Sequence, residues 1–138
     1  MRFYIAGGIA DYANLNKTAF MQAELALENA GFDTLNPWRN GLNGKPGIKG
    51  HVHMRADFLM ILNGYTDEQN KTRRPNAPLV TGPADGIVVL PGGELSLGVQ
   101  AEISFARSLH LAVLPYQHVI ENAHDVLERF VLNRRNDK

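Results

Sequence analysis

The sequence predicts an α/β fold in which a parallel sheet of four to five strands carries helices on both faces. Short runs rich in β-branched residues alternate with longer helical patterns, which is typical of parallel strands joined by helices. The run 87–90 (IVVL) lacks polar alternation, as expected of a strand that is buried on both faces. The 138 residues, of which 44% are hydrophobic, suit one domain spanning 1–138.

Hydrophobic periodicity places the individual elements. The strands are expected at residues 2–6, 32–35, 87–90 and 111–114. The helices are expected at residues 14–30, 51–63, 98–110 and 121–133. Gly31 and Gly64 directly follow the first two helices and are typical helix stops, while Pro115 ends the last strand.

Residues 64–83 form a loop insertion without clear periodicity. Long connections of this kind are uncommon in compact domains, and the simplest interpretation is a solvated loop. The alternative is a basic flap that closes over a phosphate, because the insertion contains Lys71, Arg73 and Arg74.

Composition excludes several classes of protein. Fourteen basic and fourteen acidic side chains cancel, so neither a nucleic acid nor a membrane surface is an expected partner. The lack of cysteine excludes disulfides and thiolate chemistry. No apolar run approaches the ~20 residues that span a bilayer. Because the chain begins with a strand pattern rather than a signal peptide, we expect a cytoplasmic protein.

Three segments follow the expected strands and define a candidate cleft. They are Gly7-Gly8, residues 36–39 and residues 91–98. In parallel α/β sheets, ligands bind beyond the carboxyl ends of the strands. We therefore expect these segments to converge on one binding site.

Glu102 occupies the apolar face of the helix expected at 98–110. At about 100° per residue, the polar side chains of this helix gather on one side, whereas Glu102 falls between Ala106 and Leu109. A carboxylate turned toward the core loses hydration and is rarely tolerated unless it is paired or used. We interpret Glu102 as a candidate catalytic residue.

The start of the same helix is suited to an anion. Ser96 is a natural N-cap, and capping alone would explain its presence. Gly98 in the first turn costs helix stability, roughly 1 kcal/mol relative to Ala, but lets a ligand approach the backbone amides. Ser96 and Gly98 are therefore candidate binding residues for a phosphate or a sugar hydroxyl.

Two further side chains could act with Glu102. Asp57 lies on the helix expected at 51–63, which is apolar almost all round. It is either a second acid beside Glu102 or one half of a surface pair with His53, four residues earlier. Tyr4, in the first strand, is either a core residue or a hydrogen-bond partner of Glu102.

The segments after the first two strands add candidates for substrate binding. Gly7 and Gly8 would allow close approach of a ligand, but they lack the full dinucleotide fingerprint, so no nicotinamide cofactor is predicted. Trp38 is either an ordinary loop residue or a stacking surface for a base. His51 and His53 lie two residues apart on a helix and do not face each other, so no metal site is expected.

Five segments occur in an order that resembles a known family. They are YIAGG at 4–8, NP at 36–37, MRAD at 54–57, ADGIVVLPG at 84–92 and SLGVQAE at 96–102. This pattern covers residues 1 to about 115 and is similar to the nucleoside 2-deoxyribosyltransferase-like superfamily. That group includes the 2′-deoxynucleoside 5′-monophosphate N-glycosidases.

The resemblance implies a flavodoxin-like (Rossmann-like) fold with active sites assembled at dimer contacts, so we expect a homodimer or a dimer of dimers. It also implies that Glu102 is the nucleophile, and that Asp57 and Tyr4 match the family's helical aspartate and first-strand tyrosine. Ser96 would bind the 5′-phosphate, because the family's monophosphate hydrolases carry serine at this position and its transferases carry aspartate.

Two features of the chain depart from that family pattern. The hydrolases carry an arginine in the loop after the first strand, whereas residues 8–11 here contain no basic side chain. The insertion at 64–83 is also longer than in the family.

These inferences lead to one predicted activity and two alternatives. We expect cleavage of the N-glycosidic bond of a (deoxy)nucleoside 5′-monophosphate through a covalent glycosyl ester on Glu102. Asp57 would protonate the departing base, and Tyr4 would orient Glu102. The alternatives are a nucleoside 2-deoxyribosyltransferase that exchanges bases and a nucleotide-binding module without catalysis. In each case the partner is a small nucleoside or nucleotide, and no cofactor or metal is expected.

Overall fold

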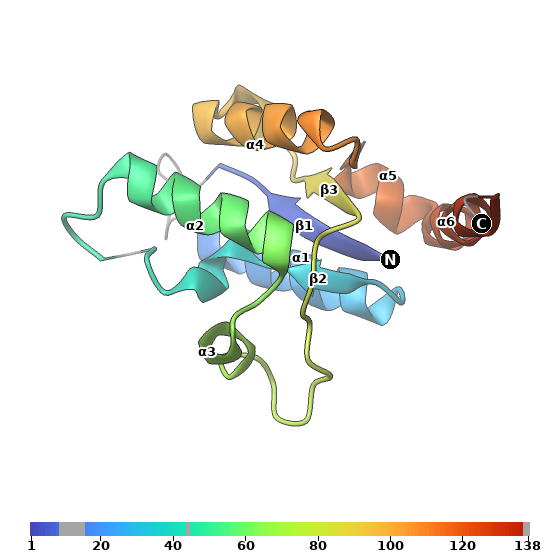
Figure 1. The fold of residues 1–138 in the computed structure, drawn as a ribbon, viewed down its shortest axis with the longest axis horizontal. Helices are drawn as coiled ribbons and strands as arrows, with labels where there is room; N and C mark the ends of the chain where they lie inside the picture. The colour runs from blue at the N-terminus through green and yellow to red at the C-terminus, as the bar shows by residue number, and fades with distance from the viewer. Residues whose placement is uncertain (9–15, 44, 137–138) are drawn as a thin grey trace.

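A four-stranded parallel sheet forms the centre of the described part of the molecule (Figure 1). The computed structural model describes residues 1–8, 16–43 and 45–136. The strands are β1 (Arg2–Ala6), β2 (Asp33–Leu35), β3 (Gly86–Val89) and β4 (Ala112–Pro115), in the spatial order β2-β1-β3-β4. This is the order of the first four strands of a flavodoxin-like sheet, and the predicted fold class is confirmed.

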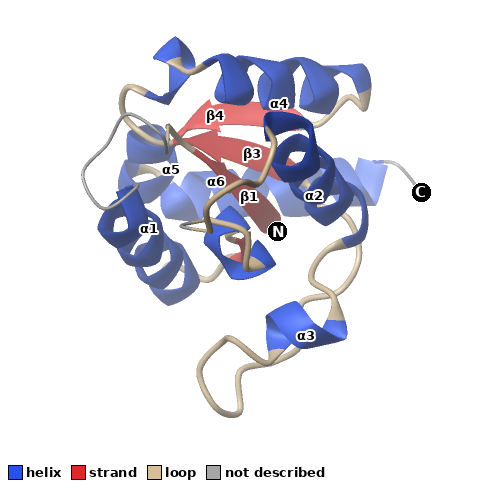
Figure 2. Ribbon diagram, turned by 90° about the vertical axis from the view of Figure 1, so that its left-hand side faces the viewer, coloured by secondary structure: helices blue, strands red, loops and turns tan. Residues whose placement is uncertain are grey.

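Helices cover both faces of this sheet (Figure 2). The longer ones are α1 (Lys17–Asn29), α2 (Gly50–Asn63), α4 (Leu97–Ser108) and α6 (Ala123–Asn136). The shorter ones are α3 (Asp67–Asn70), α5 (Tyr116–Glu121) and the 3₁₀ turns η2 (Pro37–Asn40) and η3 (Gly93–Leu95). Helices α2 and α4 share one face of the sheet, while α1 and α5 lie on the other.

The alternation of β1 side chains divides the core into two layers. Successive side chains of a strand point to opposite faces of the sheet. Phe3 and Ile5 therefore pack against the face covered by α1 and α5, whereas Tyr4 and Ala6 pack against the face covered by α2 and α4. All four side chains are fully buried. Tyr4 is thus held at the centre of the sheet, beneath α2 and α4.

The expected strands and longer helices occur within a few residues of their predicted bounds, and the short elements η2, α3, η3 and α5 are additions. The helix expected at 14–30 is seen as Lys17–Asn29, and residues 14 and 15 lie outside the described part. The segment between the last expected strand and residue 121 was not assigned to a helix. It forms α5 instead, because Pro115 in an extended conformation directly precedes a helical turn at Tyr116.

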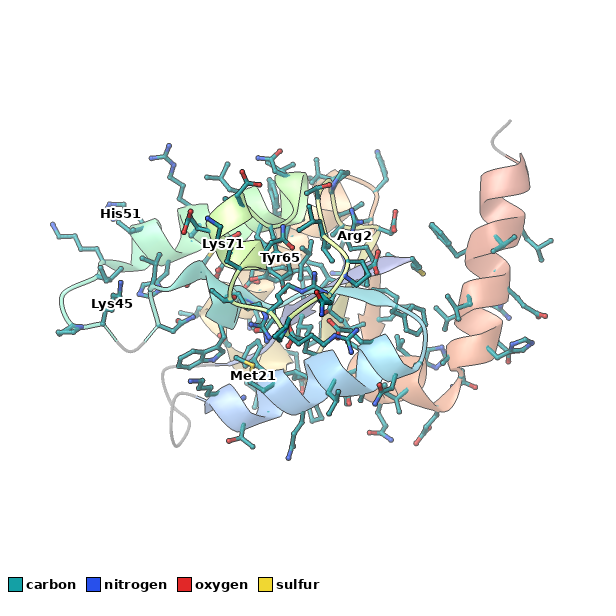
Figure 3. The ribbon with its side chains drawn as sticks, turned by 90° about the horizontal axis from the view of Figure 1, so that it is seen from below. Arg2, Met21, Lys45, His51, Tyr65 and Lys71 are labelled. Carbon is teal, nitrogen blue, oxygen red and sulfur yellow. The ribbon has the colours of Figure 1, made fainter. Side chains whose placement is uncertain are left out.

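The insertion at 64–83 is largely exposed, contains the short helix α3 and is anchored to the domain at several points. Helix α3 begins with a capping box in which Thr66 and Gln69 satisfy each other's backbone amides. Buried Asn70 bonds both backbone groups of Val80, accepting the N–H at 3.1 Å and donating to the carbonyl at 3.4 Å. The hydroxyl of Tyr65, which points into the body of the protein, accepts the N–H of Asn36 at 2.6 Å (Figure 3).

Within the described residues, the helices are too short or too polar to cross a membrane.

Candidate active site

Helices α2 and α4 lie side by side and leave a cavity between their first turns. Each helix follows a strand of the parallel sheet, so both begin near the carboxyl edge, where such sheets bind ligands. Further along, Phe58 of α2 stacks on Phe105 of α4 with ring centroids 4.2 Å apart. The cavity measures about 300 Å³. Its lining residues are Gly7, Asn43, Gly50, His53, Met54, Asp57, Ser96, Gly98, Val99 and Glu102.

Glu102 faces the interior from α4, as the helical pattern predicted. Only 6% of its surface is exposed, and its Oε2 atom has no hydrogen-bond partner among the described residues. Burial raises the pKa of this carboxyl well above its usual value, and the nearby negative charge of Asp57 raises it further. The site therefore holds an acid side chain whose proton is unusually hard to remove.

Asp57 reaches the same cavity from α2. Its Oδ1 atom accepts a hydrogen bond from Nδ2 of Asn40 at 3.1 Å. Burial raises the pKa of Asp57 to about 7, although the hydrogen bond from Asn40 and the nearby Tyr4 hydroxyl lower it. A carboxyl group whose pKa lies near neutral pH can both hold and release a proton, which suits a general acid.

The Tyr4 hydroxyl lies beneath the two carboxyl groups. Tyr4 is fully buried in the middle of β1, and its hydroxyl makes no hydrogen bond of normal geometry with a described residue. Burial, followed by the negative charges of Glu102 and Asp57, raises the pKa of Tyr4 well above its usual value. Tyr4 therefore remains a neutral phenol next to both acids, where it can donate its proton in a hydrogen bond to either carboxylate.

Ser96, Gly7 and Gly98 form the part of the cavity nearest the sheet edge. Ser96 caps α4 by accepting the N–H of Val99 at 3.4 Å, and it also lines the cavity. A Cβ atom on Gly7 would lie 2.9 Å from Cδ1 of Leu90, so only glycine fits there without movement of the core. A Cβ atom on Gly98 would meet nothing closer than 3.7 Å, so this position has room for a side chain.

Gly8 and Trp38 are not among the residues that line this cavity. Gly8 is buried, and its carbonyl accepts a hydrogen bond from Asn16 at 3.0 Å. Trp38 packs on the opposite face of the sheet, where the Lys17 ammonium lies 5.6 Å from its ring centroid. The structure thus brings together Asp57, Glu102, Tyr4, Gly7, Ser96 and Gly98 of the predicted set.

The basic side chains of the insertion are engaged elsewhere. Arg73 forms an ion pair with Glu28 of α1 at 3.3 Å, and Arg74 approaches the same carboxylate at 4.0 Å. Neither arginine lines the cavity. In this structure the insertion is therefore tied to α1, and its arginines do not cover the two acids.

Sequence reasoning missed several residues of the site. Asn40, Asn43 and Met54 were not singled out, and His53 was considered as a partner of Asp57 and as a metal ligand but not as a substrate-binding residue. His53 makes no ion pair with Asp57 within the described residues and lines the cavity independently. Asn40 lies in the segment that follows β2, and the position of that segment beyond a strand end was the signal that could have identified it.

A larger cavity, of about 550 Å³, lies at the ends of β3 and β4 on the other side of α4. Its charged lining residues, Glu94 and Arg107, are exposed. Because it contains no buried acid or base, we place the chemistry in the smaller cavity, where two carboxyl groups have raised pKa values.

The arrangement can perform acid–base and nucleophilic chemistry on a small ligand. It offers two carboxyl groups from different helices, a phenol beneath them and a helix start beside them. Among the described residues, no three His, Asp or Glu side chains are grouped so as to hold a metal ion. Comparisons with family models, curated proteins and solved structures gave no match to this chain.

Proposed function

We propose that this protein cleaves the N-glycosidic bond of a nucleoside 5′-monophosphate by double displacement, with Glu102 as nucleophile and Asp57 as general acid. One observation carries the proposal: two poorly hydrated carboxyl groups, from α2 and α4, face the same cavity above a buried tyrosine. Retaining glycosidases use two carboxyl groups in this way, one to attack the sugar and one to protonate the leaving group.

In the first step, a carboxylate oxygen of Glu102 attacks the anomeric carbon of the sugar. The bond from that carbon to the base nitrogen breaks, and its electron pair stays with the base. The proton on Asp57 passes to the base, so the products are a free base, a glycosyl ester on Glu102 and an ionised Asp57. In the second step, ionised Asp57 takes a proton from water as the water oxygen attacks the anomeric carbon. The bond from that carbon to the Glu102 oxygen breaks, so the sugar phosphate is released, Glu102 is again a carboxylate and Asp57 again carries the proton.

This cycle requires one proton on the pair of acids at its start. Two neighbouring carboxyl groups in a poorly hydrated site resist ionising together, so the pair holds a proton near neutral pH. Positive charge that develops at the anomeric carbon stabilises the nearby Glu102 anion. It thereby favours the arrangement in which the proton lies on Asp57, while the Tyr4 hydroxyl can donate to the Glu102 carboxylate.

The start of α4 supports a phosphate-bearing substrate. Ser96 and the first backbone amides of α4 lie at the positive end of a helix dipole, which favours an anion. A sugar whose C1 atom is next to Glu102 would place its 5′-substituent away from the base. We assign that substituent to Ser96 and Gly98.

Base exchange between nucleosides is the second candidate, and one observation favours it. Among the described lining residues there is neither Lys nor Arg, and such a cavity would accept a neutral nucleoside. The two candidates share the Glu102 ester and differ in whether water or a second base resolves it. A nucleotide-binding module without catalysis is the remaining alternative.

A screen for base release tests the proposal. Ribo- and deoxynucleosides and their 5′-monophosphates are incubated with the protein, and free base is measured by chromatography. Added acceptor base distinguishes transfer from hydrolysis through the appearance of a new nucleoside. Glu102→Gln should abolish release, whereas Glu94→Gln, a change at an exposed acid outside this cavity, should not. Release that persists at the wild-type rate in Glu102→Gln would refute the role of Glu102.

A homodimer belongs to the same proposal, and the outer surface of α2 supports it. Val52, Leu59 and Leu62 are 39%, 45% and 39% exposed, so this helix presents apolar side chains to solvent near the cavity. The double change Leu59→Lys and Leu62→Lys should produce monomers in analytical ultracentrifugation and weaken activity. Leu25→Lys, at an exposed leucine on α1 across the sheet, is the matched control and should leave the dimer intact.

A further inference from the structure

We propose that His53 supplies the positive charge for the substrate's phosphate, so that this site prefers a phosphorylated sugar only while His53 is protonated. The inference rests on the proposed function for the identity of the ligand. It assigns a residue and a pH dependence that the proposed function does not contain.

The first observation concerns the ionisable side chains among the described residues that line the cavity. Its ionisable residues are Asp57, Glu102 and His53. A phosphate brings up to two negative charges into a space that already contains two acids. The segment 9–15 after β1 contains neither Lys nor Arg in the sequence, and the arginines of the insertion pair with Glu28. His53 is therefore the lining side chain that can become a cation.

The second observation is that the imidazole of His53 has no partner among the described residues. Asp57 receives a hydrogen bond from Asn40, and Glu102 lies against the Tyr4 hydroxyl. Among the described residues, the His53 side chain makes no hydrogen bond or ion pair, although it is only partly exposed in the cavity wall; its backbone N–H donates to the carbonyl of Lys49 at 3.4 Å. Both ring nitrogens are therefore free to bind a ligand.

The position of His53 suits a phosphate held at the start of α4. His53 lies in the first turn of α2, and Ser96 precedes the first turn of the neighbouring α4. Met54, the residue after His53, comes within 3.8 Å of the point where a Cβ on Gly98 would lie. The two helix starts thus face one another across the cavity, with His53 on one side and Ser96 on the other.

The groups around His53 make the effect dependent on pH. Asp57 lies one turn along α2, Glu102 faces the cavity from α4, and Tyr4 lies below both in β1. The exposed cations Lys45 and Lys49 precede α2 but do not line the cavity. Histidine side chains ordinarily change charge between about pH 5 and pH 8. A sugar phosphate should therefore bind more tightly, relative to the unphosphorylated sugar, at the lower end of this pH range than at its upper end.

The experiment compares the binding of 2-deoxyribose 5-phosphate with that of 2-deoxyribose, and the binding of ribose 5-phosphate with that of ribose. These sugars carry no base, so the base of the natural ligand need not be known. Binding to the full chain is measured by NMR titration from about pH 5.5 to about pH 8. The variants are His53→Gln, which removes the charge, and His53→Lys, which makes it permanent. His51→Gln is the matched control, because His51 is exposed, points outward and does not line the cavity (Figure 3).

We expect the preference for the phosphorylated sugar at low pH to fall roughly tenfold or more in His53→Gln, the effect of losing one charge-assisted hydrogen bond. His53→Lys should keep that preference at every pH, and His51→Gln should behave as the wild type. The imidazole signal of His53 should shift when sugar phosphate binds. Because phosphate itself titrates near pH 6, the His53→Gln profile provides the correction for that ionisation.

Two outcomes would overturn the inference. One is an unchanged, pH-dependent preference for the phosphorylated sugar in His53→Gln. The other is sugar phosphate binding that leaves the His53 signal unmoved. These results are separate from the proposed function, which base release in Glu102→Gln and wild-type protein decides. The site can bind a sugar phosphate through His53 without cleaving a nucleotide, and it can release base without using His53.

Discussion

Asn40 holds Asp57 through an amide whose orientation is fixed from the other side. Its Nδ2 atom donates to Oδ1 of Asp57 at 3.1 Å, while its Oδ1 atom accepts the backbone N–H of Leu42 at 2.8 Å. Rotating the amide would break both bonds. Asn40 therefore always presents an N–H to Asp57, which favours the ionised carboxylate and opposes the effect of burial. We regard Asn40 as a positioning residue for the candidate acid.

Removal of that amide should change the ionisation of Asp57. In Asn40→Ala, the pKa of Asp57 should rise above its present value of about 7, because burial remains and a donor to the anion is lost. Carbon NMR of the aspartate carboxyl groups measures this directly. Asn43→Ala, which removes an amide that bonds the carbonyl of Pro37 instead, should leave the Asp57 signal in place. A lower pKa in Asn40→Ala would contradict the proposed effect of the hydrogen bond.

Buried Glu102 and partly exposed Asp57 should also make the protein less stable as pH rises. Asp57 titrates at about 7 in the folded state against 3.8 ordinarily, and the pKa of Glu102 is raised by burial. A folded-state pKa above the unfolded value gives stability that is complete below the unfolded pKa and is lost as pH rises through the folded pKa. At about 1.4 kcal/mol per pKa unit, Asp57 alone contributes up to about 4 kcal/mol.

Urea unfolding from about pH 5 to about pH 8 measures this loss. The free energy of unfolding should decrease over that range in the wild type. It should decrease less in Asp57→Asn and in Glu102→Gln, because each change removes one of the acids that must ionise. A wild-type profile that is flat or rises with pH would show that both carboxyl groups are already well solvated.

Gly7 and Gly98 should respond differently to the same substitution. Gly7→Ala puts a methyl group 2.9 Å from Leu90 and 3.1 Å from Phe20, and overpacking of this kind typically costs about 1–3 kcal/mol. Gly98→Ala meets only ordinary contacts in a helix, so stability should stay the same or increase by up to about 1 kcal/mol. Thermal or urea unfolding of both variants provides the comparison. Equal destabilisation by the two changes would contradict the packing described here.

The insertion at 64–83 should lose stability when its buried hydroxyl contact is removed. Tyr65→Phe leaves the buried N–H of Asn36 without its partner at 2.6 Å, which typically costs about 1–3 kcal/mol. Tyr116→Phe is the control, since the Tyr116 hydroxyl makes no hydrogen bond with the described residues and the side chain is partly exposed. Limited proteolysis should cut the insertion faster in Tyr65→Phe than in the control. Equal cutting rates would mean that the contact does not anchor the segment.

Several features of the site follow from local sequence patterns alone. The side of α4 on which Glu102 lies depends on helical periodicity, and the observed burial agrees with it. Ser96 was expected to cap the helix and does so by accepting the N–H of Val99. These properties involve neighbours within a few residues, so a short stretch of sequence is enough to predict them.

The remaining features depend on which distant segments meet. Trp38 packs in the core layer opposite the cavity. Its position depends on how the segment after β2 packs, and no local sequence pattern encodes that packing. The contact between Asn40 and Asp57 joins residues seventeen apart, on η2 and α2. The sequence alone allowed the arginines of the insertion to bind a phosphate. In the folded protein they lie beside Glu28 instead.

The sequence by itself determined the alternating strands and helices, the parallel sheet and the inward direction of Glu102, because hydrophobic periodicity is a property of single segments. Only the tertiary structure decided that Asp57 and Glu102 share one poorly hydrated cavity above Tyr4. Burial raises the pKa values of both groups, and the nearby charge of Asp57 raises that of Glu102 further; both effects depend on the packing of two helices over one strand.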